Sequence, residues 1–105
     1  MFRHVVLFKW TEGVGPDRVE AVTTALEALP AAIPALRGYE VGPATSGTHD
    51  FAVVADFDDE DGWRSYDEHP DHVRVREELI LPLVADRAIV RYVVDERRRL
   101  RDVRP

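Results

Sequence analysis

The chain has 105 residues, no cysteine and a formal net charge of −6. A chain of this length forms one small domain, the lack of cysteine excludes disulfides and thiolate metal sites, and the acidic balance argues against nucleic acid as a partner. No apolar run approaches the ~20 residues that cross a bilayer, and the N-terminal segment lacks the order of a signal peptide. We therefore expect a cytoplasmic protein that has no membrane segment.

The first half of the chain predicts a strand, a helix and a second strand. Residues 3–10, RHVVLFKW, are β-branched and aromatic as in strands, and apolar residues on both of their faces suggest that both faces are covered. Pro16 suits the first position of a helix. An apolar stripe at helical spacing follows it: Val19, Val22, Leu26 and Leu29. The segment GYEVGP predicts a short second strand, before a turn-rich loop.

The second half predicts a strand, two helical segments and a last strand. Residues 51–57, FAVVADF, form the strand, and the acidic run DDED marks the start of a helix. Pro70 must end or kink this helix near His69, because proline disfavours the α conformation at the residue before it. A further helix begins at about Asp71 and places one stripe on one face: His72, Val75, Leu79 and Leu83. RAIVRYVV is the last strand.

The order strand, helix, strand, strand, helix, strand predicts an α+β fold of the ferredoxin-like type, with the helices on one face of an antiparallel sheet. Strands that are apolar on both faces need a cover for the other face, and in a short chain a second copy is the simplest cover. We therefore predict a homodimer. The domain should span residues 1–95, and the arginine-rich residues 96–105 should form a flexible tail outside the core.

Several segments together resemble the Dabb family, the stress-responsive A/B barrel proteins. They are HVVLFKW at the start, LPAAIPALRGYEVG at 29–42, DFAVVADFDDEDGWRSY at 50–66 and HPDH at 69–72. The resemblance covers about residues 2–94. It implies a dimeric α/β barrel in which two sheets close around each other and each subunit keeps a small cavity between sheet and helices.

The resemblance also implies a chemistry, because the family includes the olivetolic acid cyclase of plants. That enzyme closes a linear polyketide thioester by an intramolecular aldol condensation. Its catalytic pair resembles Tyr66 and His72, and its first-strand histidine resembles His4. The sequence departs from it at Phe51, where the cyclase has a further pocket histidine, and at 74–76, where bulky and charged residues follow HPDH.

The residues themselves leave two readings of this site open. His72 begins an apolar helical stripe, so its imidazole should face inward and could serve as a general base; alternatively it is a core histidine with a satisfied partner. Tyr66 could donate to a developing oxyanion, or be an aromatic partner of Trp63. His4 shares a strand face with apolar neighbours. We expect His4 and four apolar residues to bind the substrate: Val6, Phe8, Val53 and Val75.

Two functions from different classes follow. The first is a cofactor-independent polyketide cyclase or lyase that catalyses an aldol-type step on a small β-carbonyl substrate. We expect no metal site, because Pro70 interrupts the helical turn that His69 and His72 would need in order to bind one ion together. The second is a non-enzymatic, stress-responsive dimeric module that binds a small hydrophobic or polyketide-like ligand. A haem-handling or monooxygenase-like dimeric barrel is a third possibility, which no residue specifically supports.

Overall fold

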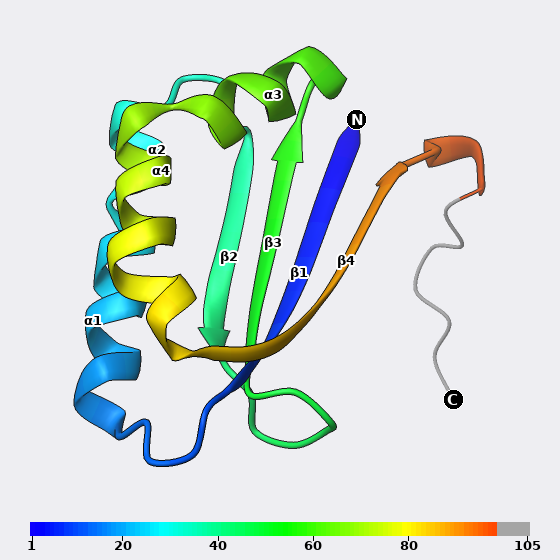
Figure 1. Cartoon of the computed structure of the whole chain (residues 1–105). Coiled ribbons are helices and arrows are strands. Elements are labelled where there is room, and N and C mark those ends of the chain that lie inside the picture. The colour runs from blue at the N-terminus through cyan, green and yellow to red at the C-terminus, as the bar shows by residue number, and fades with distance from the viewer. Residues whose placement is uncertain (99–105) are drawn as a thin grey trace.

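A computed structural model describes residues 1–98 and places four strands in one antiparallel sheet, with helices gathered along one side of it (Figure 1). The elements are β1 (Phe2–Trp10), α1 (Pro16–Glu27), α2 (Leu29–Ala32), β2 (Gly38–Pro43), β3 (Phe51–Phe57), α3 (Glu60–Glu68), α4 (Pro70–Val75) and β4 (Val84–Val93). The strands lie in the order β2-β3-β1-β4. This arrangement confirms the predicted ferredoxin-like α+β subunit.

The core lies between the sheet and the helices. Alternate residues of β3, from Phe51 to Phe57, are buried, because successive side chains of a strand point to opposite faces. From the helical side, α1 contributes Val22 and Leu26, each 1% exposed. As predicted, Pro16 occupies the first turn of α1. The helix ends at Glu27, so Leu29 reaches the core from α2 instead.

The opposite face of the sheet is covered by no helix of the described chain (Figure 1). Its residues form rows across the strands, and one row pairs Val5 with Val54 on one side and with Val90 on the other. In a neighbouring row, Arg3 donates two hydrogen bonds to Asp56, Nε to Oδ1 at 2.7 Å and Nη2 to Oδ2 at 3.0 Å. The face therefore combines an apolar centre with a bidentate ion pair.

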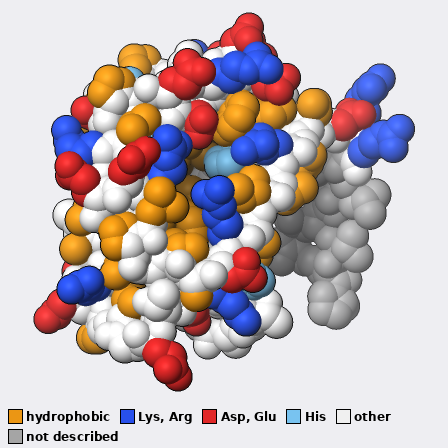
Figure 2. Space-filling view, in the orientation of Figure 1, with side chains coloured by type: hydrophobic (Ala, Val, Ile, Leu, Met, Phe, Trp, Pro, Cys, Tyr) orange, Lys and Arg blue, Asp and Glu red, His pale blue; other side chains and the backbone are white. Residues whose placement is uncertain are grey.

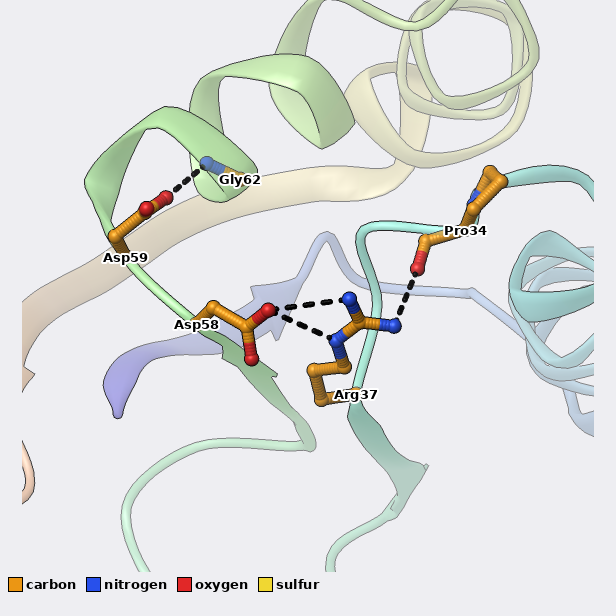
Figure 3. Close-up of polar contacts among 5 residues, drawn as sticks. All are labelled: Pro34, Arg37, Asp58, Asp59 and Gly62. Carbon is orange, nitrogen blue, oxygen red and sulfur yellow. Dashed lines mark hydrogen bonds and ion pairs between the residues drawn. The ribbon is translucent and has the colours of Figure 1, made fainter.

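Side-chain contacts fix the start of α3 (Figure 3). Asp59 caps the helix, since its Oδ1 accepts a hydrogen bond from the Gly62 amide at 2.9 Å. Just before it, Asp58 accepts from both Nε and Nη2 of Arg37, and the same guanidinium donates to the Pro34 carbonyl. These contacts connect the loop before β2 to the loop after β3, at the point where α3 departs to cover the sheet.

The chain bends between α3 and α4, where the sequence predicts a break. His69 has an extended backbone with ψ of 132°, and Pro70 occupies the first turn of the next helix. The His69 Nδ1 accepts a hydrogen bond from the Asp71 amide at 3.1 Å, so this histidine caps α4. The bend brings the Tyr66 ring of α3 against the His72 ring of α4.

The predicted stripe along the second helical segment is only partly correct. His72, Val75 and Leu83 are buried as predicted, but residues Arg76–Ile80 form a π-helical turn in which the Leu81 amide bonds to the Arg76 carbonyl. A π turn holds one more residue than an α turn. Ile80, at 3% exposed, therefore takes the inward position that α-helical spacing assigns to Leu79, which is only partly buried.

Strand β4 forms an edge of the sheet and is exposed along nearly its whole length. Glu96–Arg98 form one 3₁₀ turn beyond it. The predicted boundary at residue 95 stays a prediction, because most of the proposed tail lies outside the described residues. Within residues 1–98, no helix combines the length and the apolar composition that crossing a membrane requires.

Candidate active site

A cavity of about 360 Å³ lies between the sheet and the α3–α4 corner. Its walls come from both layers and include His4, Val6, Phe8, Leu26, Val53, Trp63, Tyr66, Asp67, His72, Arg76, Ile80, Leu81, Arg87, Ile89 and Arg91. Figure 2 shows a hollow with hydrophobic and histidine side chains inside it and basic side chains around its mouth. The cavity thus has an apolar interior with a small set of polar groups, as ligand sites usually do.

His72 is a neutral imidazole held in one tautomer. Its Nδ1 lies 3.2 Å from the Asp67 carbonyl oxygen. Because a carbonyl can only accept, Nδ1 carries the proton and Nε2 keeps its lone pair. Burial lowers the pKa of His72 below its ordinary value, and the nearby Arg76 guanidinium lowers it further. At neutral pH the residue therefore has an unprotonated nitrogen available as a base.

Tyr66 packs directly on His72, with ring centroids 4.1 Å apart. Its side chain is 2% exposed, and its hydroxyl lies 2.9 Å from the hydroxyl of Tyr39 on β2. Burial raises the pKa of both phenols, to about 12 for Tyr39, so both keep their protons at neutral pH. Two hydroxyls that share one hydrogen bond leave one proton free, and this proton can be donated to a ligand.

One row of paired residues crosses the sheet beneath α3. Ala55 pairs with Tyr39 on one side and with His4 on the other, and His4 pairs in turn with Arg91. From α3, Tyr66 covers the tyrosine end, and its ring centroid is 6.3 Å from that of His4. A tyrosine, a histidine and an arginine are thus aligned along one row below the helix.

His4, like His72, is a buried histidine at the cavity. Burial lowers its pKa to about 4, and the positive charge of Arg91 contributes. Its Nδ1 is buried and has no hydrogen-bond partner among residues 1–98, and the same is true of Nε1 of Trp63. The two rings lie 6.0 Å apart. His4 is therefore neutral at pH 7 and can offer a neutral donor or acceptor.

The sequence matches the family described as Stress responsive A/B Barrel Domain, Dabb, over residues 2–94. The chain belongs to the Dabb family. The match spans all four strands and the cavity between them and the helices, so the site described above is built within the family's domain.

Proteins similar to this Dabb domain include several of known structure. A dimeric ferredoxin-like protein of unknown function from Thermobifida fusca is 49% identical, with a TM-score of 0.81 over 89% of this chain and 90% of that one. An uncharacterised Streptomyces coelicolor protein is 43% identical over 69% of this chain and 79% of its own length. A hydroxynitrile lyase from Passiflora edulis has a TM-score of 0.80 at 13% identity, over 90% and 94% of the two chains. At that identity the lyase shows a shared fold.

The structure brings together most of the residues that the sequence singles out. His4, Tyr66 and His72 all line the cavity, as do the expected apolar residues Val6, Phe8 and Val53. Val75 does not, because it is buried beside a separate hollow that Leu29 and Ala25 also line. His49 lies in the loop between β2 and β3, where its Nδ1 is 2.8 Å from the Thr48 hydroxyl.

Other residues of the Dabb cavity carry no clear signal in the sequence. Tyr39 becomes visible only once the register of β2 against β3 is known. Arg87 and Arg91 alternate with Ile89 along the last strand, and this period of two indicates a shared face without showing which face it is. Asp67 acts through its backbone carbonyl, which no sequence pattern reveals. In the described part of the chain, no three His, Asp or Glu side chains are placed to hold a metal ion.

Proposed function

We propose that this protein is a cofactor-independent lyase or cyclase that catalyses an aldol-type step on a small β-carbonyl substrate, in the manner of a polyketide cyclase. The observation that carries this proposal is the neutral His72, fixed by the Asp67 carbonyl and in tilted ring contact with Tyr66 at the wall of the cavity. A base and a hydroxyl donor side by side in an apolar pocket are the two groups that enolate chemistry requires.

In the proposed reaction, His72 Nε2 removes a proton from a carbon beside a carbonyl group. The C–H electron pair forms the enolate, and the Tyr66 hydroxyl donates a hydrogen bond to the oxygen where negative charge develops. The enolate carbon then attacks a second carbonyl of the same chain, which forms the new C–C bond. The resulting alkoxide takes its proton back from the His72 imidazolium, so the step needs no oxidant, reductant or other co-reactant.

Tyr39 supports this arrangement as a positioning residue. When Tyr66 donates to the substrate, the Tyr39 hydroxyl donates to the Tyr66 oxygen at 2.9 Å. Hydrogen bonds arranged in such a chain strengthen one another. The high pKa of both phenols keeps them as donors throughout the pH range in which His72 is a free base.

The apolar wall fits the remainder of such a substrate. Val6, Phe8 and Val53 on the sheet face Leu26 and Ile80 from the helices, and all five are buried. A cavity of about 360 Å³ lies at the small end of the range for ligand pockets, roughly 300–1,000 Å³. The Passiflora edulis hydroxynitrile lyase supports the proposal at the level of the fold, since it is a lyase with this architecture.

We further propose that the working form is a homodimer in which two sheets pack through their open faces into a barrel. The apolar row of Val5, Val54 and Val90 needs such a cover, and the Thermobifida fusca protein of the same fold is dimeric at 49% identity. An isologous contact lets one apolar patch cover its own copy.

The test is turnover of N-acetylcysteamine thioesters of linear 3-oxo and 3,5-dioxo acids, followed by mass spectrometry and proton NMR. The expected result is a cyclised or cleaved product with the native protein and none with His72→Gln. If the native protein binds these compounds and returns them unchanged, the protein is a binding module for small hydrophobic ligands, and the catalytic proposal is rejected.

A further inference from the structure

The mouth of the cavity is basic, although the protein as a whole is acidic. Three arginines line the cavity, Arg76, Arg87 and Arg91, against one carboxylate, Asp67. The whole chain has a net charge of −6. Figure 2 shows basic side chains beside the hollow, while acidic side chains are spread over the surrounding surface. Positive charge is therefore concentrated at the place where a ligand would enter.

The arginines differ in how they are neutralised. Arg76 donates to the Asp67 carboxylate at 3.2 Å, so that pair contributes little net charge. Arg87 and Arg91 form no ion pair with any carboxylate of residues 1–98. Two positive charges at the cavity are thus available to an incoming anion.

The sheet register directs both free arginines toward the cavity. Arg87 pairs with Phe8 and Arg91 pairs with His4, and both partners are buried on the helix-covered face. Ile89 lies between the two arginines on the same face and pairs with Val6. Paired residues of neighbouring strands share a face, so the two guanidinium groups flank an apolar contact on the wall of the cavity.

Arg91 is also held in place. Its guanidinium carbon lies 4.0 Å from the ring centroid of Trp63, a cation–π contact. Contact with the ring restrains the guanidinium, and the planar fork of N–H groups in a guanidinium matches the two oxygens of a carboxylate or phosphate. Trp63 is in turn fixed by its place on α3 above Phe2 and His4.

We propose that Arg87 and Arg91 form an oxyanion-binding subsite, which selects small molecules that carry a carboxylate or a phosphate together with an apolar chain. The chain would occupy the wall of Val6, Phe8 and Val53, and the oxyanion would sit at the β4 side of the cavity. This subsite deepens the proposed function, since it names a substrate class for the same cavity. Binding itself does not depend on turnover, so the two proposals can fail separately.

The experiment compares three unreactive probes of equal chain length by isothermal titration calorimetry: hexanoate, hexyl phosphate and the neutral hexanamide. Hexanoate or hexyl phosphate should bind at least ~10-fold more tightly than hexanamide, because hydrogen bonds to charged groups contribute about 1.5–3 kcal/mol. A preference for hexanoate identifies a carboxylate substrate, and a preference for hexyl phosphate identifies a phosphate ester.

Substitutions of the two arginines test whether the tighter binding of anionic probes arises from this subsite. Arg91→Gln and Arg87→Gln should each weaken binding of the anionic probe by roughly 10-fold or more and leave hexanamide unchanged. Arg18→Gln is the matched control, because it removes the same charge from an exposed position on α1 that does not line the cavity. His72→Gln should still bind the anionic probe even where turnover is lost.

Three outcomes overturn the proposal. The first is equal affinity for the anionic probes and hexanamide, and the second is a loss in Arg18→Gln as large as that in Arg91→Gln. The third is the absence of binding by all three probes at millimolar concentration. Circular dichroism of each variant excludes misfolding as the cause, and Arg91→Lys, which keeps the charge, should recover part of the affinity.

Discussion

The two faces of the sheet are built from the same strands but differ in burial and in proposed role. On the helix-covered face, β1 places His4, Val6 and Phe8 in the core and at the cavity, each 7% exposed. On the open face, the residues in between, such as Val5 and Leu7, are only partly buried. Because side chains alternate along a strand, one sequence can supply a binding site with one set of residues and an assembly surface with the other.

The faces also differ in their electrostatics. The helix-covered side of the sheet holds His4 of β1, with His72 of α4 facing the same cavity, and burial lowers the pKa values of both, so neutral groups that can exchange protons lie there. The open face holds a fixed ion pair, Arg3 with Asp56, in bidentate geometry. Neutral histidines beside the two arginines without an ion pair in residues 1–98 on one side, and a paired arginine on the other, indicate that each face can be altered by mutation without the other.

The largest expected effect on the helix-covered face is that of His72→Gln. Removing a general base typically costs about 10²–10⁴-fold in rate, and steady-state kinetics on the thioester panel would measure it. The dimer should persist, since His72 does not lie on the open face. Loss of the dimer together with activity would show that the two faces are coupled.

On the open face, Val54→Asp should dissociate the proposed homodimer. The substitution places an unpaired carboxylate in the centre of the apolar row, where its desolvation is costly. The mass measured by analytical ultracentrifugation should change from about twice the chain mass to 12.0 kDa. Ala31→Asp adds the same charge at an exposed position of α2 and should leave the mass unchanged. A native protein that sediments as a monomer would contradict the prediction.

The pH dependence of stability tests the lowered pKa of His4 on the helix-covered face. His4 has a pKa of about 4 in the folded protein, against 6.5 for the free side chain. The unfolded chain therefore binds more protons between these values, and stability should fall as the pH drops from about 6.5 toward 4. The loss amounts to at most about 3.5 kcal/mol, at roughly 1.4 kcal/mol per pKa unit.

Urea unfolding at pH 7.5 and pH 5, at fixed protein concentration, would measure this loss. The His4→Phe variant should show a smaller drop than the native protein over the same interval, because phenylalanine has no proton to bind. Identical pH profiles for the two proteins would show that His4 contributes nothing.

The smallest effect is expected from Tyr39→Phe, which removes the hydroxyl behind Tyr66. Loss of one supporting hydrogen bond of about 0.5–1.5 kcal/mol should slow turnover by roughly 2- to 10-fold, less than Tyr66→Phe does. In a Tyr66→Phe background the same change should have no further effect on the rate. Additive losses in the double variant would mean that Tyr39 acts on its own.

The fold can be predicted from the sequence because the patterns that indicate its elements are local. Proline positions predict where α1 begins and where α3 must end, and alternation along residues 51–57 predicts a strand. The π turn is not predictable in this way. The turn puts Ile80 in the core where regular α-helical spacing would put Leu79. Because both residues are large and apolar, the hydrophobic pattern of the sequence does not show which of them faces inward.

For the candidate site, the sequence predicts only those residues that lie close together in the chain or share one strand. Tyr66 and His72 are six residues apart across a proline bend, and His4 shares its phase with Phe8. The contributions of Tyr39 and Arg91 arise from strand pairing, in which residues far apart in the chain become neighbours of Ala55 and His4. Registers of this kind depend on the whole sheet, so they require the structure.

The π-helical turn at Arg76–Ile80 also bears on how homologous sequences should be aligned. A relative whose helix is α-helical throughout reaches the same core position with one residue fewer. Aligned without a gap, its inward-facing residue would be matched to Leu79 instead of Ile80, and every later position up to the start of β4 would be displaced. A single-residue gap between positions 76 and 80 aligns the inward-facing residues again. The presence or absence of this gap then distinguishes relatives that have the extra residue from those that lack it.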